Sequence, residues 1–271
     1  MGRCLQVVHT FKQNITGTNP ETLAAGTSDS LSVPNFEAGT QGHLLEAWAG
    51  VSAHAADFQL RSPNFHDNNR GIRMAYQFDP TLSGADGDPQ FLLPYYVKQR
   101  LYRSDTLIVE TIGTATDNVA LDLLMYFDNL EGADQRLESW AAIEGRITDM
   151  VGIKVAATAG ATGNYGSNRT LNQDDDRLIA NQDYAILGAT GQLACGLLAF
   201  TAPETSGRRI GLPLHWDGQK SAGFFVDLST KYNLPLIPVI NSNNKGNVIF
   251  QAADAAAGVA TAATIIMAQL A

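Results

Sequence analysis

Cysteine and charge are both scarce in this sequence. Its 271 residues include only two cysteines, Cys4 and Cys195, which excludes a framework of several disulfides. Charged residues make up 17% of the chain and hydrophobic residues 45%, whereas a disordered chain has the opposite bias. The composition therefore predicts a folded protein whose neutral surface is suited to being covered by neighbouring molecules.

Positive charge is especially scarce. Lysine and arginine total 18 against 27 aspartate and glutamate residues, which gives a net charge of −9. Proteins that bind nucleic acid usually carry a basic stripe or domain. The basic stretches at 100–103 and at Arg208-Arg209 are too short to make one. We expect no direct contact with nucleic acid, and we interpret Arg208 and Arg209 as solvated, ion-paired or contact positions.

Long apolar runs are missing as well. The most apolar stretch, Val259–Leu270, has 12 residues and includes Thr261 and Gln269, which is too short for the roughly 20-residue helix that crosses a bilayer. Met1–Gln6 contains no apolar core of a secretion signal, and Gln6 stands where a myristoylation motif needs serine or threonine. We expect a soluble chain, made or assembled in a reducing compartment.

Strand-like alternation is the main pattern that is present. In the segment 71–78, every second residue is apolar, as expected when one face of a strand is buried. Similar patterns predict further strands at Leu5–Phe11, His43–Leu60 (two strands), Asp105–Thr111 and Val119–Phe127. The polar, glycine-containing turn at 113–118 predicts that the last two form a hairpin.

One segment at the midpoint of the chain has helical spacing. Apolar residues recur there three or four positions apart, and Asp134 lies near the start, where a carboxylate favours a helix N-terminus. The apolar positions are Leu137, Trp140, Ala141, Ile143, Ile147, Met150 and Val151. The pattern predicts a helix within residues 133–151.

The second half of the chain repeats features of the first. Pro203 follows Pro63 by 140 residues, and Val259 follows Val119 by the same distance. Six strand-like blocks recur in order at an offset of 140 to 141. We therefore predict a mainly β fold of two similar β-sandwich (jelly-roll) units in tandem, at residues 1–132 and 152–271, joined by a helix at 133–151.

A glycine-rich segment offers an enzymatic alternative. Ala185–Ala194 contains Gly188-Ala189-Thr190-Gly191, which resembles the cofactor-binding turn of atypical short-chain dehydrogenases. That resemblance implies an NAD(P)-dependent reductase that binds the cofactor pyrophosphate at this turn. Two features weigh against it: the segment lies two-thirds along the chain, and no Tyr-x-x-x-Lys pair occurs. We expect no cofactor.

Other candidate sites are weak. The histidines lack the close spacing of metal ligands, and Asp174-Asp175-Asp176 lacks the glycine and alternating oxygens of a calcium loop. We therefore expect no catalytic residue and no metal. Trp216 lies in a loop-like context and, with Arg208 and Arg209, is a possible contact residue. A bimodular carbohydrate-binding protein that uses Trp216 is a further alternative. The five histidines are His9, His43, His54, His66 and His215.

The repeat, the short strands, the central helix and the strand-like Val259–Leu270 together resemble the double jelly-roll major capsid proteins of tailless icosahedral viruses and phages. This resemblance covers the whole chain but rests on architecture, so it carries over no functional residue. It implies a non-enzymatic shell subunit with no small-molecule substrate. Such a subunit forms homotrimers that tile a capsid lattice. The implied location is the virion, assembled in the host cytoplasm, with other virion proteins as partners. Either an internal membrane or another, basic protein would lie beneath the shell.

Overall fold

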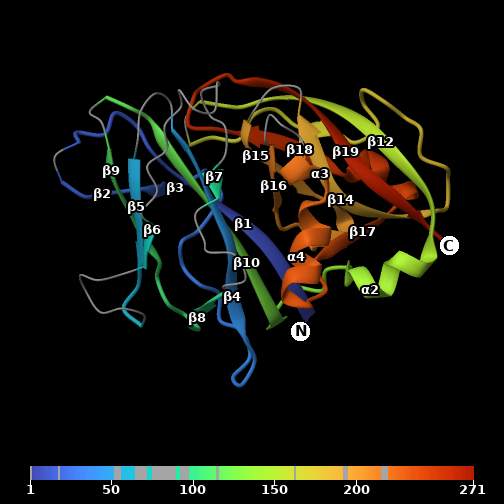
Figure 1. The fold of residues 1–271 in the computed structure, drawn as a ribbon, viewed down its shortest axis with the longest axis horizontal. Helices are drawn as coiled ribbons and strands as arrows, with labels where there is room; N and C mark the ends of the chain where they lie inside the picture. The colour runs from blue at the N-terminus through green and yellow to red at the C-terminus, as the bar shows by residue number, and fades with distance from the viewer. Residues whose placement is uncertain are drawn as a thin grey trace.

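The computed structural model describes residues 2–17, 19–51, 56–64, 72–74, 90–91, 98–113, 116–161, 163–191, 195–214 and 219–271. The described chain is built mainly from antiparallel strands (Figure 1). β19, Ala260–Leu270, shows why these segments form strands. Its buried and partly exposed residues alternate, with Ile265 buried and Ile266 half-buried, and this is the period of a pleated strand.

The first half of the chain forms two sheets. The β1 sheet has the order β3-β1-β10-β4-β7, with β8 also paired to β4, and the β9 sheet has the order β2-β9-β5-β6. Their strands are β1 (Gly2–Lys12), β2 (Glu21–Thr22), β3 (Ala24–Ala25), β4 (Gly42–Val51), β5 (Ala56–Arg61), β6 (Ile72–Met74), β7 (Gln90–Phe91), β8 (Gln99–Leu101), β9 (Ile108–Gly113) and β10 (Val119–Leu130).

The second half also forms two sheets. The β14 sheet has the order β11-β17-β14-β19-β12, and the β15 sheet has the order β13-β18-β15-β16. Their other strands are β11 (Leu137–Glu138), β12 (Ile147–Thr158), β13 (Arg169–Thr170), β14 (Asp183–Gly191), β15 (Cys195–Thr201), β16 (Ile210–Leu214), β17 (Ile237–Asn241) and β18 (Ile249–Ala253). The helices are α2 (Trp140–Ile143), α3 (Gln219–Ala222), α4 (Phe224–Tyr232) and the 3₁₀ turns η1 (Glu144–Arg146), η2 (Pro203–Thr205) and η3 (Ser242–Asn247).

Both halves pair their strands in the same way. With β3, β8 and β11 set aside, the described residues of each half form eight strands in chain order. One sheet of each half has the order first-eighth-third-sixth, and the other has the order second-seventh-fourth-fifth. This is the jelly-roll arrangement. The fold is therefore mainly β, with two jelly-roll sandwiches in tandem.

The predicted helix at 133–151 is wrong for most of its length. Only α2 and η1 are helical, and β12 begins at Ile147. From Gly152 onward the buried residues alternate with more exposed ones, and glycine disfavours a helix interior. Pairing with β19 along the whole of β12 outweighs the local three-and-four spacing.

The predicted hairpin between Asp105–Thr111 and Val119–Phe127 is also wrong. Both segments contain strands, β9 and β10, but β9 pairs with β2 and β5, whereas β10 pairs with β1 and β4. The polar connection therefore crosses from one sheet of the sandwich to the other, as a jelly roll requires between its seventh and eighth strands.

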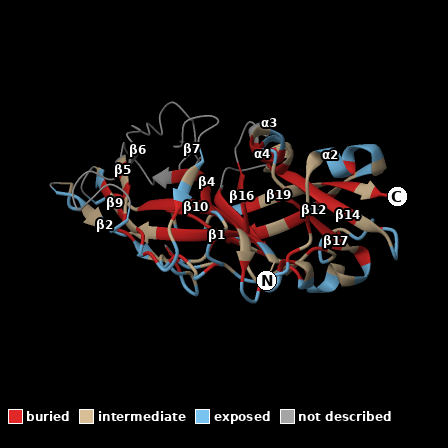
Figure 2. Ribbon diagram, turned by 90° about the horizontal axis from the view of Figure 1, so that it is seen from below, coloured by how far each residue is buried: buried red, intermediate tan, exposed pale blue. Residues whose placement is uncertain are grey.

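The two sandwiches meet along a seam, which we define as the contact of β1, β4 and β10 with β15, β16 and α4. They share a buried core there. Alternate residues of β1 and β10 point into the first sandwich, while Leu5, Val7, Leu124 and Tyr126 belong to the core of the second half. Trp48 of β4 joins the same core. Figure 2 shows β1, β10 and β4 as largely buried, with β16 close beside them. The β1 sheet is thus covered on both faces.

No helix in the described part of the chain is long and apolar enough to cross a membrane.

Candidate functional site

Several buried polar side chains lie at the seam. His9 of β1 and Asp122 of β10 are register partners, and Trp48 of β4 lies opposite Asp122 on its other side. All three side chains are buried. His9 Nδ1 lies 2.7 Å from Asp122 Oδ1, and the indole Nε1 of Trp48 donates to the carbonyl oxygen of Gly196 in the second half at 2.8 Å.

Asp29 links this row to the second half. Its Oδ2 accepts hydrogen bonds from the backbone N–H of His9 at 2.8 Å and from the hydroxyl of Tyr165 at 2.7 Å. Its Oδ1 lies 3.4 Å from Arg209 Nη1. The guanidinium of Arg209 in turn lies over the Tyr165 ring, 4.1 Å from its centroid, an arrangement that adds cation–π attraction to the ion pair.

Burial raises the pKa values of two acids at the seam. Burial raises the pKa of Asp254 to about 6, although the Gly196 backbone N–H donates to it at 3.1 Å. Burial also raises the pKa of Asp29. For His9, burial opposes the charged form, but the carboxylates of Asp122, Asp29 and Asp254 together raise the pKa of the imidazole.

A His–Asp pair can serve as a general base, but this one cannot meet a substrate. His9 and Asp122 are 0% and 1% exposed. Their contacts lie within the seam, with Phe11 and Tyr165 flanking the imidazole ring. We interpret the cluster as a buried polar network that fixes how the two sandwiches meet.

Small residues allow this close contact. Gly211 of β16 faces Val7 of β1, and a Cβ on Gly211 would lie 2.8 Å from two carbon atoms of Val7. The backbones also bond directly, since the N–H of Val7 donates to the carbonyl oxygen of Arg209 at 2.9 Å. The backbone N–H groups of Leu5 and His9 likewise donate to the side chains of Gln135 and Asp29.

The glycine segment predicted to bind a cofactor is not a turn. Gly188–Gly191 lie inside β14 and pair with β19. A Cβ on Gly188 would lie 2.1 Å from the carbonyl oxygen of Ser221 in α3. The glycine is needed because α3 packs directly on the strand. The next described element after the segment is the strand β15, which begins at Cys195, and not a helix whose N-terminus could hold a pyrophosphate. The reductase alternative is therefore wrong.

The remaining candidates are Trp216, the other histidines and the acidic run at 174–176. Trp216, His54, His66 and His215 are outside the described residues, so a contact role for Trp216 stays a prediction. Each carboxylate of 174–176 has a partner: Asp174 accepts from the Ala156 backbone, Asp175 pairs with Arg177, and Asp176 pairs with Lys245. Within the described ranges, no group of three or more histidine, cysteine or acidic residues is placed to hold a metal.

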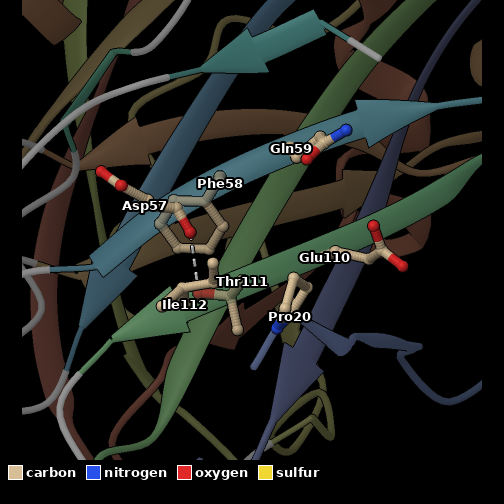
Figure 3. A pocket seen from close by; sticks show the side chains of 7 residues that line it. All are labelled: Pro20, Asp57, Phe58, Gln59, Glu110, Thr111 and Ile112. Carbon is tan, nitrogen blue, oxygen red and sulfur yellow. Dashed lines mark hydrogen bonds between the residues drawn. The ribbon is translucent and has the colours of Figure 1, made fainter. Parts of the chain in front are cut away.

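The described surface includes a smaller and a larger hollow. The smaller one, about 20 Å³, lies over β5 and β9 on the β9 sheet, with Glu110, Ile112 and Gln59 around it (Figure 3). Its wall is closed by a hydrogen bond from the Thr111 hydroxyl to the Asp57 carbonyl oxygen at 3.0 Å. It holds about one water molecule. The larger hollow, about 210 Å³, lies at the mouth of the seam and includes Arg208 and Arg209.

Comparison with known proteins adds little to this picture. No protein-family model and no curated protein matches the sequence. Among solved structures, the chain is similar to the major capsid protein P2 from Bacteriophage PM2, with 6% identity, a TM-score of 0.21, and coverage of 99% of this chain and 98% of that one. It is also similar to the STIV MCP, with 9% identity, a TM-score of 0.21, and coverage of 98% and 97%. Scores this low do not bear on function, and the jelly-roll assignment rests on the strand pairing.

Proposed function

We propose that this chain is a non-enzymatic capsid shell subunit that assembles with copies of itself into a virion lattice. The observation that carries the proposal is the unlike nature of the two surfaces that meet at the seam. The first sandwich contributes its first, third and eighth strands, β1, β4 and β10. The second contributes its fourth and fifth strands, β15 and β16, together with α4.

A contact between unlike surfaces of similar units can be repeated. Such a head-to-tail contact either closes into a ring or continues as an open array. In this chain the corresponding surfaces at the two ends are β5 and β6 of the first sandwich and β12, β14 and β19 of the second. Three chains joined in this way place six jelly-roll units around one axis. This geometry supports a homotrimer with a nearly hexagonal outline, which can tile a shell.

The division of the chain belongs to this proposal. We propose units at 1–132 and 152–271 with a connection at 133–151, into which the first residues of β12 extend. We further propose that the shell is that of a bacteriophage or related virus, assembled in the host cytoplasm with other virion proteins and above an internal membrane. The net charge of −9 supports the absence of direct contact with nucleic acid.

Light scattering on size-exclusion fractions, combined with negative-stain images, tests the assembly. We expect trimers or larger lattices with six lobes per trimer. Met150→Asp alters a side chain of β12 that is 50% exposed, and we expect it to shift the population toward the monomer. Ile179→Asp is the matched control, since Ile179 is 57% exposed but lies in the loop before β14. A wild-type chain that stays monomeric at high concentration overturns the proposal.

A further inference from the structure

The larger hollow is lined by residues of both sandwiches. β1 and the turn that follows β3 form one side, and the residues just before β16 form the other. The hollow is about 210 Å³ and is lined by Gln6, Val7, Val8, Ser28, Asp29, Ser30, Gly207, Arg208 and Arg209. Because about 10–15 Å³ of such space holds one water molecule, this hollow is large enough for a small polyatomic ion or the end of a side chain.

The two arginines of the hollow differ in the partners of their guanidinium groups. Arg209 is paired with Asp29, lies over Tyr165 and donates from Nε to Gln251 at 3.3 Å. Arg208 donates from Nη1 to the neutral side-chain oxygen of Gln6 at 2.8 Å, and no carboxylate of the described residues forms an ion pair with it. The guanidinium of Arg208 has further N–H donors besides the one bonded to Gln6.

The local charge has the opposite sign to that of the molecule. Arg208 and Arg209 against Asp29 leave one net positive charge in the lining, on a chain whose net charge is −9. The hydroxyl groups of Ser28 and Ser30 are exposed at the rim and add neutral donors. A guanidinium with free donors beside hydroxyl groups is the arrangement that binds carboxylate or phosphate oxygens.

We propose that this hollow is an oxyanion site in which Arg208 binds a carboxylate or a phosphate. The anion comes either from solution or from an acidic side chain of a second copy of this chain. Arg209 and Asp29 hold the wall in place, and Gln6 orients the guanidinium of Arg208 toward the space. Because both sandwiches line the site, anion binding requires that they be in contact at the seam.

Calorimetric titration of the purified full chain with inorganic phosphate, and separately with acetate, tests the site. We expect saturable binding that Arg208→Gln weakens about tenfold or more, because a charge-assisted hydrogen-bond pair is lost. Arg208→Lys should retain part of the affinity, since it keeps the charge. Arg100→Gln is the matched control: it removes the same charge from β8, where Arg100 lies over Tyr102. Circular dichroism confirms that each variant is folded.

The source of the anion is found by measuring assembly with and without phosphate. If phosphate weakens assembly of the wild type but not of Arg208→Gln, the natural occupant is a carboxylate of a second copy. If phosphate binds through Arg208 and assembly is unchanged, the occupant is a free anion. If the chain is monomeric and still binds phosphate through Arg208, the proposed trimer is wrong but the oxyanion site stands. Equal isotherms for the wild type and Arg208→Gln overturn the site itself.

Discussion

At the scale of single residues, the seam depends on protons as well as on packing. Asp254, Asp29 and His9 all have raised pKa values. A raised pKa in the folded protein means that the native state binds protons more tightly than the unfolded chain does. Each of these groups therefore makes the protein less stable as the pH rises through the interval between its unfolded and folded pKa.

The first prediction concerns Asp254. Between pH 3.8, its ordinary pKa, and about 6, its raised one, the native carboxyl is still protonated while the unfolded one is ionised. The free energy of unfolding should fall across this interval by about 3 kcal/mol. Urea unfolding at a series of pH values measures the slope, and Asp254→Asn should flatten it. Parallel curves for the wild type and the variant would show that Asp254 does not titrate in this way.

Gly211 provides a second residue-scale prediction. Gly211→Ala places a Cβ 2.8 Å from Val7 and 2.9 Å from Leu197, so the seam must open slightly. We expect a loss of about 1–3 kcal/mol in the free energy of unfolding. The added change Val7→Ala should recover part of it, because it removes Cγ2, one of the two Val7 carbon atoms that would collide, and leaves only Cβ in place. Gly145→Ala, which meets nothing within 4 Å, is the control and should change little.

Residue-level prediction from the sequence succeeded only where burial follows from local pattern. Trp48 lies within the predicted strand segment His43–Leu60, and it is buried. His9 gave no signal, because its partner Asp122 is 113 positions away and the two meet only through strand register. Asp29, Tyr165 and Asp254 were missed for the same reason. The sequence shows Arg208 and Arg209 as neighbouring charges. It does not show that Arg209 pairs with Asp29 whereas Arg208 bonds to the neutral side chain of Gln6.

At the scale of elements, the alternation of apolar residues predicted strands correctly, whereas helical spacing, turn composition and glycine content did not predict the other elements. Leu5–Phe11 and Val119–Phe127 lie in β1 and β10. Both strands are buried on both faces, and this follows from the seam rather than from alternation. The helix, the hairpin and the glycine turn were wrong because spacing, turn composition and glycine are local signals. In a jelly roll, long-range pairing decides between local alternatives.

Gly188 supports an element-scale prediction. Gly188→Ala forces β14 and α3 apart, since the new Cβ would lie 2.1 Å from a backbone oxygen that cannot rotate away. We expect a loss of roughly 1–3 kcal/mol or more in unfolding free energy, with local loss of hydrogen-exchange protection in α3 and α4. Gly246→Ala, in η3 and free of close neighbours, is the control. Unchanged protection in α3 would mean that the strand and helix are not in contact.

At the scale of the whole molecule, the shared core predicts that the two sandwiches unfold together. Trp48 contacts Phe224 of α4 edge-on at 5.8 Å and bonds to Gly196, and Tyr232 donates to the Leu45 carbonyl oxygen at 2.8 Å. Calorimetry of the wild type should show one cooperative transition. Two resolved transitions would indicate that the seam contributes little.

Trp48→Phe tests how far the seam maintains this cooperativity. It removes the bond to Gly196 and leaves a buried carbonyl oxygen without its donor, at a cost of about 1–3 kcal/mol. We expect the single transition to broaden or split. Trp140→Phe is the matched control, because Trp140 is only half-buried and lies in α2.

The pairing of the first strand with the eighth sets an order of events during synthesis. β1 cannot find its partner until β10 has left the ribosome, and β12 must wait in the same way for β19, at Ala260–Leu270. For most of translation the chain carries an unpaired strand edge, a state that invites aggregation. Closing such distant pairs is also intrinsically slow. The β14 sheet, and with it the second sandwich, is complete only after β19 is made, so the proposed assembly requires synthesis to have passed Leu270.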